Sequence, residues 1–168
     1  MAELTPAEKL QPCLLDRLTD DEPHRQKESR TQRIMSMTRY RQSVLRDLAW
    51  LLNTSAHMDQ DGLDDFEELP SSVLNYGVQS LTGVSATSLD VTDMRYRLIE
   101  ALQRFEPRIL ANSISIFVTM EPEEMSNRSI RFEIRGDLWA QPMPEALYIQ
   151  TEIDLETGHC QLQRGARG

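Results

Sequence analysis

Apolar residues in the first two thirds of the chain recur at the three- and four-residue spacing of amphipathic helices. The clearest stripe predicts a helix over residues 40–52, and a second predicts a helix from about residue 92 to residue 105. Pro107 ends this second helix, because proline lacks an amide donor and disfavours the α conformation at Glu106. The first part of the chain is therefore expected to be helical.

Two shorter helices are predicted beside the long ones. The first covers residues 12–18 and carries three leucines. The second follows Pro70 and ends before Gly77, which stands where helices often finish on a left-handed glycine. Residues 24–36 are polar and basic with little to bury, so we predict a mobile linker between the first short helix and the first long one.

After the second long helix the apolar period changes from that of a helix to the period of two that is typical of strands. Residues 130–135 show the plainest alternation, and further strands are expected over residues 114–119, over residues 147–153 and from Cys160 onward. Gly158 supplies a positive φ for the last hairpin loop. Helices followed by strands, without regular alternation, predict an α+β fold with N-terminal helices packed on a C-terminal, mostly antiparallel four-stranded sheet.

The length of 168 residues fits one domain with a flexible end. We expect residues 1–36 to form a short helix and a flexible linker, and residues 37–164 to form a single α+β domain. Cys13 and Cys160 have no other cysteine to form a cluster with, so we interpret them as free thiols in a reducing compartment. No secretory signal opens the chain, and no apolar run approaches the roughly 20 residues that span a bilayer. The protein is therefore expected to be cytoplasmic, without direct membrane insertion.

Charge narrows the choice of partners. The formal net charge is -9, which argues against nucleic acid as a partner because binding a polyanion requires a cationic surface. The charge is also uneven, since basic residues gather within residues 17–46 and residues 59–68 are almost wholly acidic. Such blocks are usually solvated faces, but they also set the register of docking in an assembly. Composition alone does not decide whether these blocks are solvated faces or docking surfaces.

Residue types that carry catalysis or bind metals are scattered along the chain. His24, His57 and His159 fall in the linker, a loop and a hairpin turn, and none has a second histidine three or four residues away. No nucleotide-binding or nucleophile motif occurs, so we predict no catalytic, cofactor-binding or metal-binding residue. Glu106 and the acidic segment could be nominated as the carboxylate pair of a glycosidase. Aromatic residues make up only 6% of the chain, which is little for a sugar cleft, and a lysozyme-like peptidoglycan hydrolase stays the alternative.

Four stretches, taken in order, resemble one family. Residues 14–23 (LLDRLTDDEP) resemble the N-terminal signature of TssE proteins, the small baseplate subunits of type VI secretion systems. Residues 40–54 and residues 72–77 (SVLNYG) resemble the first long and the second, short helix of those proteins. Residues 105–108 (FEPR) resemble the Glu-Pro-Arg motif that the family shares with baseplate wedge proteins of contractile-tailed phages. The resemblance covers roughly residues 14–163.

The resemblance implies a structural protein and not an enzyme: a phage tail-like baseplate component that links wedge subunits to the contractile sheath and templates sheath polymerisation. The implied partners are the wedge subunits TssF, TssG and TssK and the sheath subunits TssB and TssC, and no cofactor is implied. Two groups of residues are nominated for partner binding. They are Glu106, Pro107 and Arg108 in the motif, and Leu14, Leu15 and Leu18 in the first short helix.

The residues of the motif support this reading in physical terms. Pro107 fixes the direction of the chain at the corner between helix and strand, so that Glu106 and Arg108 project with restricted freedom. An arginine fork there can bind a partner carboxylate with two hydrogen bonds. We expect Arg108 to dock on a partner and not within its own fold, so that Arg108→Ala changes the melting temperature little. The alternative is that Glu106 and Arg108 make only local contacts. A terminal sheet with exposed edges could also exchange strands with partners.

Overall fold

The structure of the chain is a computed structural model, and it describes residues 10, 12–19, 24, 35–56, 66–82, 90–119 and 129–164. The helical elements are α1 (Leu14–Leu18), α2 (Met37–Leu52), the 3-10 turns η3 (Leu69–Ser71) and η4 (Val73–Asn75), α3 (Val91–Phe105) and η5 (Ala111–Ser113). The strands are β1 (Ser115–Thr119), β2 (Ser129–Leu138), β3 (Glu145–Asp154) and β4 (Cys160–Arg164). The predicted α+β class is confirmed, with helices before strands.

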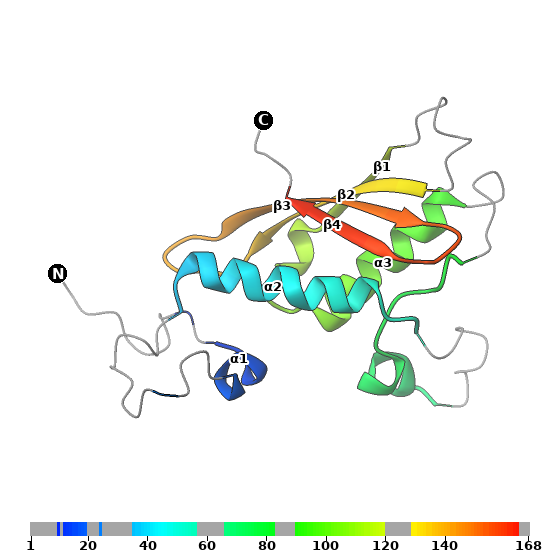
Figure 1. Ribbon diagram of the computed structural model, residues 1–168. Coiled ribbons are helices and arrows are strands. Elements are labelled where there is room, and N and C mark those ends of the chain that lie inside the picture. Colours follow the sequence, from blue (N-terminus) through cyan, green and yellow to red (C-terminus); the bar gives the residue numbers. More distant parts are fainter. Residues whose placement is uncertain are drawn as a thin grey trace.

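The strands form one antiparallel sheet in the order β1-β2-β3-β4, each strand pairing with its neighbours in sequence. Burial alternates along β2 and β3, which is what a sheet covered on one face requires. Figure 1 shows α2 and α3 against this covered face, and among the described residues no helix lies over the opposite face. The architecture is thus two layers, helices below and sheet above.

The core fills the space between these two layers. Its fully buried side chains come from α2, α3, the turn after α3, and the inward positions of the strands. The largest of them are Phe132, Leu48, Leu51, Leu102, Ile109, Ile134, Leu138, Ile149, Val44 and Cys160. The two long helical stripes predicted from the sequence therefore face the sheet.

Both long helices begin with a side-chain cap. Ser36 accepts a hydrogen bond from the backbone N–H of Arg39, which starts α2 three residues before the predicted position. Asp90 caps α3 by accepting hydrogen bonds from the backbone N–H groups of Thr92 and Asp93. The helix ends at residues 52 and 105 agree with the prediction.

The segment after Pro70 differs from the single short helix that was expected. It forms two 3-10 turns, because Ser72 takes an extended conformation between them. Gly77 has a φ of 137°, and a Cβ atom there would lie 2.4 Å from the carbonyl oxygen of Thr54. Glycine is therefore required by the close approach of another backbone segment, and not as a left-handed helix cap.

Within the N-terminal part the structure shows the short helix α1, while most of the predicted linker and most of the acidic segment lie outside the described residues. Met35 is buried, and its N–H donates to the carbonyl of Leu10 at 3.2 Å. Leu10 also packs against the core, so contact with the core begins well before residue 37, and the expected domain boundary there stays a prediction. Both cysteines are free thiols. In the described ranges, none of the helices is long and apolar enough to cross a bilayer.

Candidate partner-binding site

The Glu-Pro-Arg corner joins the end of α3 to the sheet. The N–H of Glu106 still donates to the carbonyl of Leu102, so Glu106 completes the last helical turn. The carbonyl of Arg108 then accepts from Trp139 N–H, and Leu110 N–H donates to Asp137. These bonds fasten the corner to the end of β2, and they fix the direction in which the Arg108 side chain leaves the backbone.

The guanidinium of Arg108 is bound inside its own chain. Its Nε lies 2.7 Å from Oε1 of Glu106, and one Nη bonds Oε2 of the same carboxylate, which makes a bidentate fork. That Nη also lies 2.6 Å from Oδ2 of Asp47 on α2, and the other lies 3.4 Å from the hydroxyl of Ser43. Glu106 is buried, with 3% of its surface exposed, so the motif's carboxylate points inward and not toward a partner.

The electrostatics of the corner follow from this geometry. Burial of the Arg108 guanidinium lowers its pKa, but the hydrogen bonds and charges of Glu106 and Asp47 outweigh burial and hold that pKa above its ordinary value. Burial raises the pKa of the neighbouring Tyr40 phenol, and burial together with the Asp47 charge raises that of Tyr76. The corner is thus a charge cluster in which the Arg108 guanidinium is compensated by the carboxylates of Glu106 and Asp47.

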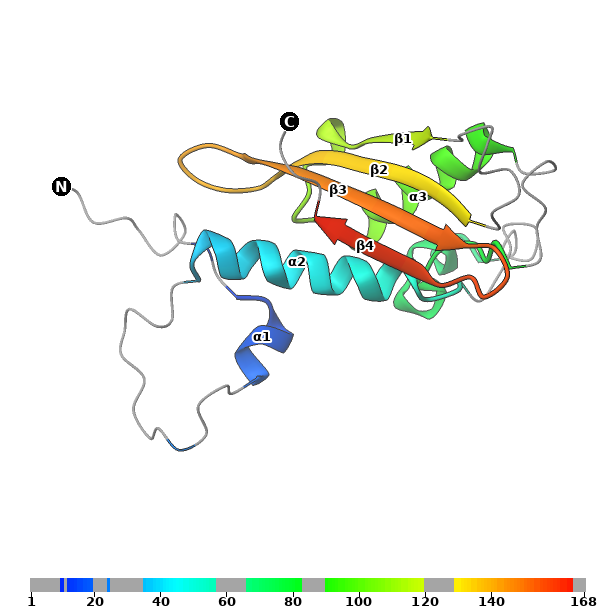
Figure 2. The same ribbon diagram turned by 45° about the horizontal axis from the view of Figure 1, so that its top comes forward.

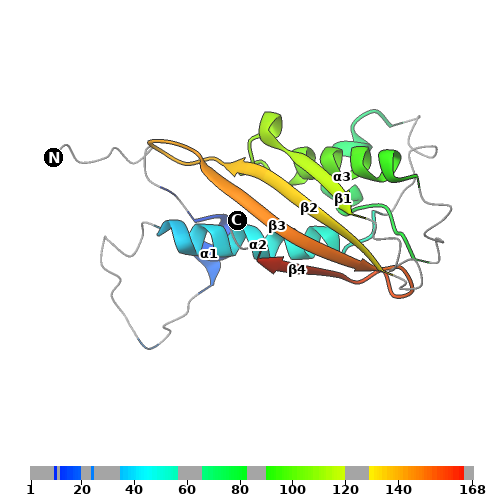
Figure 3. The same cartoon turned by 90° about the horizontal axis from the view of Figure 1, so that it is seen from above.

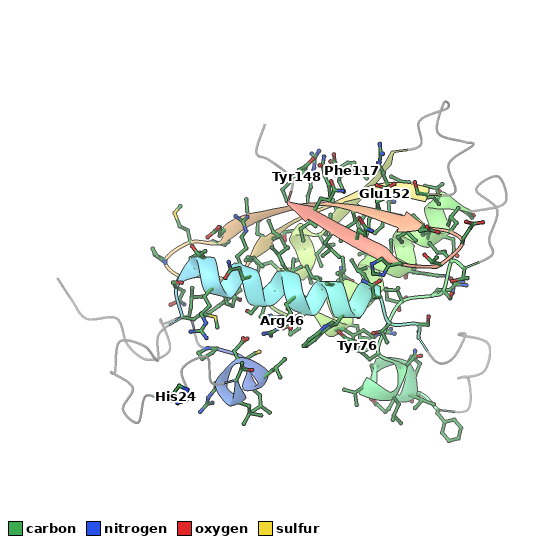
Figure 4. The ribbon with its side chains drawn as sticks, viewed as in Figure 1. His24, Arg46, Tyr76, Phe117, Tyr148 and Glu152 are labelled. Carbon is green, nitrogen blue, oxygen red and sulfur yellow. The ribbon has the colours of Figure 1, made fainter. Side chains whose placement is uncertain are left out.

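The charge cluster extends from the corner to α1. Arg46 bonds Asp47 at 2.8 Å on one side and Asp16 of α1 at 2.7 Å on the other. Figure 4 shows Arg46 on the side of α2 that α1 approaches. Burial raises the pKa of Asp16, but hydrogen bonds from Cys13 and Arg46 and the charge of Arg46 hold that pKa below its ordinary value. Alternating charges therefore link α1, α2 and the motif.

Helix α1 is held by these polar contacts while its leucines stay in contact with solvent. Leu14 is 71% exposed and Leu18 is 73% exposed, with Leu15 less so, and no residue of α1 is buried. Figure 1 shows α1 and the η3–η4 segment on the side of α2 that faces away from the sheet. The helices contribute further exposed apolar residues, namely Trp50, Val73 and Leu74. These exposed apolar side chains are the candidates for partner binding on this side of the molecule.

The residues predicted for partner binding thus fall into two groups, those that are exposed and those that are bound within the chain. Leu14 and Leu18 are exposed as expected, and Pro107 is exposed at the corner. The expectation that Arg108 stays out of its own fold needs correction, because Glu106 and Asp47 bind it; the local-contact alternative describes this chain better. Partner binding by the six residues stays a prediction.

Sequence reasoning missed the residues that complete the corner. Ser43 and Asp47 lie one turn apart on α2, and Arg46 joins Asp47 to Asp16. No sequence signal pairs Asp47 with Arg108, which lies 61 residues away. The i, i+4 spacing of Ser43 and Asp47 on one helix face was the available clue, since residues four apart lie side by side.

Comparison with known proteins assigns the family. A family model described as baseplate wedge protein gp25 matches residues 38–143, which is more than half of the chain. The matched range contains α2 except for its first residue, together with α3, the Glu-Pro-Arg corner, β1 and β2. A search of curated proteins gave no match, and neither did a search of solved structures. The resemblance seen in the motifs is confirmed, and the chain belongs to the family of baseplate wedge protein gp25.

Proposed function

We propose that this chain is a structural component of a type VI secretion baseplate, where it links the wedge subunits to the contractile sheath and templates sheath polymerisation. Family membership supports a structural role in a phage-like baseplate. Support for the type VI assignment comes from residues 14–23, whose TssE-like signature lies before the matched range. The proposed site of action is the cytoplasm, at the base of the assembled machine.

The observation that carries the proposal is the exposure of Leu14 and Leu18 on a helix that is fixed by polar contacts. The Asp16–Arg46 ion pair holds α1 in place, so the leucines are presented and not buried. Exposed leucines on a positioned helix are suited to a hydrophobic groove of another protein. We assign this surface to the wedge subunits TssF, TssG and TssK, and the sheet to the sheath subunits TssB and TssC.

The hydrolase alternative is weakened by the state of Glu106. A glycosidase acid must reach the sugar oxygen, whereas Glu106 is buried and Arg108 binds both its carboxylate oxygens. A salt-bridged carboxylate of this kind is a structural counter-ion. We therefore propose that the chain has no lytic activity. Release of fragments from purified peptidoglycan, lost on Glu106→Gln, would favour the hydrolase.

Co-purification tests the proposed function. A tagged chain should retain TssF, TssG and TssK, and the double variant Leu14→Ser/Leu18→Ser should lose them because the apolar contact is removed. Met143→Ser is the matched control, since Met143 is 69% exposed on the β2–β3 loop. Equal recovery of wedge subunits with the leucine variant and with the control would show that α1 is not the wedge-binding surface.

A further inference from the structure

Helix α1 depends on the rest of the domain for its position. It has five residues, and none of them is buried. A helix this short has no stability of its own in water, because nucleating a helix costs more than one turn of hydrogen bonds returns. Figure 2 shows α1 beside the N-terminal half of α2, on the side away from the sheet, and Figure 3 shows the same overlap from above. Contacts with the domain are therefore what keeps α1 folded and in place.

Arg46 supplies such contacts from α2. Its Nη1 donates to Oδ1 of Asp16 at 2.7 Å, and its Nη2 lies 3.9 Å from the sulfur of Cys13, the residue before α1. The Cys13 thiol donates to Oδ2 of Asp16 at 2.9 Å. The side chain of Asp16 is only 7% exposed, whereas Leu14 and Leu18 are mostly exposed. The charged residue of α1 thus faces the domain, and the leucines face outward.

Asp47 determines where the Arg46 side chain points. Its Oδ1 accepts from Nε of Arg46 at 2.8 Å and lies 2.8 Å from Nη2 as well. The guanidinium also lies over the ring of Trp50, 5.3 Å from the ring centroid. Because the guanidinium is planar, fixing one edge and one face leaves Nη1 a single direction, which is the direction of Asp16.

Asp47 is itself fixed by the Glu-Pro-Arg corner. Its Oδ2 accepts from Nη2 of Arg108 at 2.6 Å, while Arg108 is held by both carboxylate oxygens of Glu106. Glu106 is buried, so this series of bonds starts in the core and ends on α1. Asp47 occupies the middle of the series and divides its two oxygens between the corner and Arg46.

We propose that Asp47 is a positioning residue for wedge binding: it orients Arg46 toward Asp16 and thereby makes the rigid Glu-Pro-Arg corner set the position of the exposed leucines of α1. This inference rests on the proposed function for its partner. The effect is exerted through Arg46 and not through contact of Asp47 with a wedge subunit. Leucines held in one place lose less conformational freedom on binding, so the partner binds them more tightly.

Amide hydrogen exchange, measured by NMR on the full-length chain, tests the positioning without a partner. The N–H groups of Arg17 and Thr19 donate to the carbonyls of Cys13 and Leu15, so these two amides are protected only while α1 is formed. In Asp47→Asn we expect them to exchange about fivefold faster, as for the loss of one net hydrogen bond. The amides of β2 should stay about a hundredfold slower or more, so that unfolding of the whole domain cannot account for the change.

Three further variants locate the effect. Asp16→Asn should speed exchange of the two α1 amides by a similar factor, and adding Asp47→Asn should speed it no further, because both act through Arg46. Asp47→Glu keeps the carboxylate and should restore most of the protection. Asp93→Asn is the matched control, since it removes an exposed carboxylate that pairs with Arg97 at 2.8 Å on α3, and it should leave α1 unchanged. An equal acceleration by Asp47→Asn with and without Asp16→Asn would overturn the proposal.

Binding of purified TssF–TssG complex connects the position of α1 with function. Asp47→Asn should weaken this binding by about threefold or more, since the affinity falls with the fraction of chains whose α1 is in place, and Asp47→Glu should restore it. Faster exchange in α1 with unchanged TssF–TssG affinity would overturn the role in wedge binding. Absence of TssF–TssG binding by the wild-type chain would contradict the proposed function, and exchange would still decide whether Asp47 positions α1.

Discussion

Replacement of Arg108 by alanine tests whether the Glu-Pro-Arg corner is a structural charge cluster. The substitution leaves the Glu106 carboxylate, which is buried, without the fork that binds both its oxygens. Removing one partner of a buried pair costs about 3–5 kcal/mol. Arg108 and Asp47 are each about one-fifth exposed, so we take the lower end, ~3 kcal/mol. For a chain of this size that corresponds to a melting temperature lower by about 10 °C.

This expectation replaces the one drawn from the sequence, in which Arg108→Ala left the melting temperature almost unchanged. Arg108→Lys should recover only part of the loss, because an ammonium keeps the charge but not the fork. The double variant Glu106→Gln/Arg108→Ala should be more stable than Arg108→Ala, since no buried carboxylate is left without a counter-ion. Thermal unfolding by circular dichroism, with calorimetry for the enthalpy, measures all three variants.

A melting temperature of Arg108→Ala within about 2 °C of the wild type, a shift of less than 1 kcal/mol for a chain of this size, would show that the corner is not a structural charge cluster. A double variant less stable than Arg108→Ala would show that the stranded charge is not the cause of the loss. Tyr40→Phe provides a control for nonspecific loss of packing, since Tyr40 lies beside the cluster and is also buried.

Three shorter predictions follow from the same structure. Burial raises the pKa of the Cys160 thiol to about 12, so a maleimide should label Cys13 in the native protein and Cys160 only after unfolding, as mass spectrometry of digests would show. Gly77→Ala should destabilise the protein by ~2 kcal/mol or more, because the new Cβ clashes with backbone and the positive φ disfavours alanine; an equal melting temperature would contradict this. The folded-state pKa of Asp16 lies below its unfolded value, so the α1 contact is stabilised above that unfolded value, 3.8, and is lost as pH falls through the folded pKa. The NMR signal of the Arg46 Nη1–H group, which donates to Asp16, should move over this range in the wild type and should not show this change in Asp16→Asn.

Much of the fold could be predicted because local patterns agree with it. The stripes of α2 and α3 have helical spacing, Pro107 limits the second, and β2 alternates at a period of two. Each of these signals acts within a few residues of the feature it determines. The antiparallel meander then follows from short connections between consecutive strands.

The contacts that define the site could not be predicted, because they join residues far apart in the chain. Asp47 reaches Arg108 and Arg46 reaches Asp16 only once α2 lies between the corner and α1. The hydrogen bonds between the Asn53 side chain and the Cys160 backbone likewise depend on α2 ending beside β4, across 107 residues of sequence. A sequence motif identifies one residue of such a contact, as it does Arg108, but it gives no information on the distant residue that Arg108 binds.

The central claim is that this chain links a baseplate wedge to a contractile sheath. Its most direct test is to count fluorescent TssB–TssC sheaths in producing cells that lack the chain, before and after the wild type is restored. The account predicts no sheaths without the chain, normal numbers with the wild type, and none with Leu14→Ser/Leu18→Ser at wild-type protein levels. Sheaths that assemble in normal numbers in cells without the chain would contradict it.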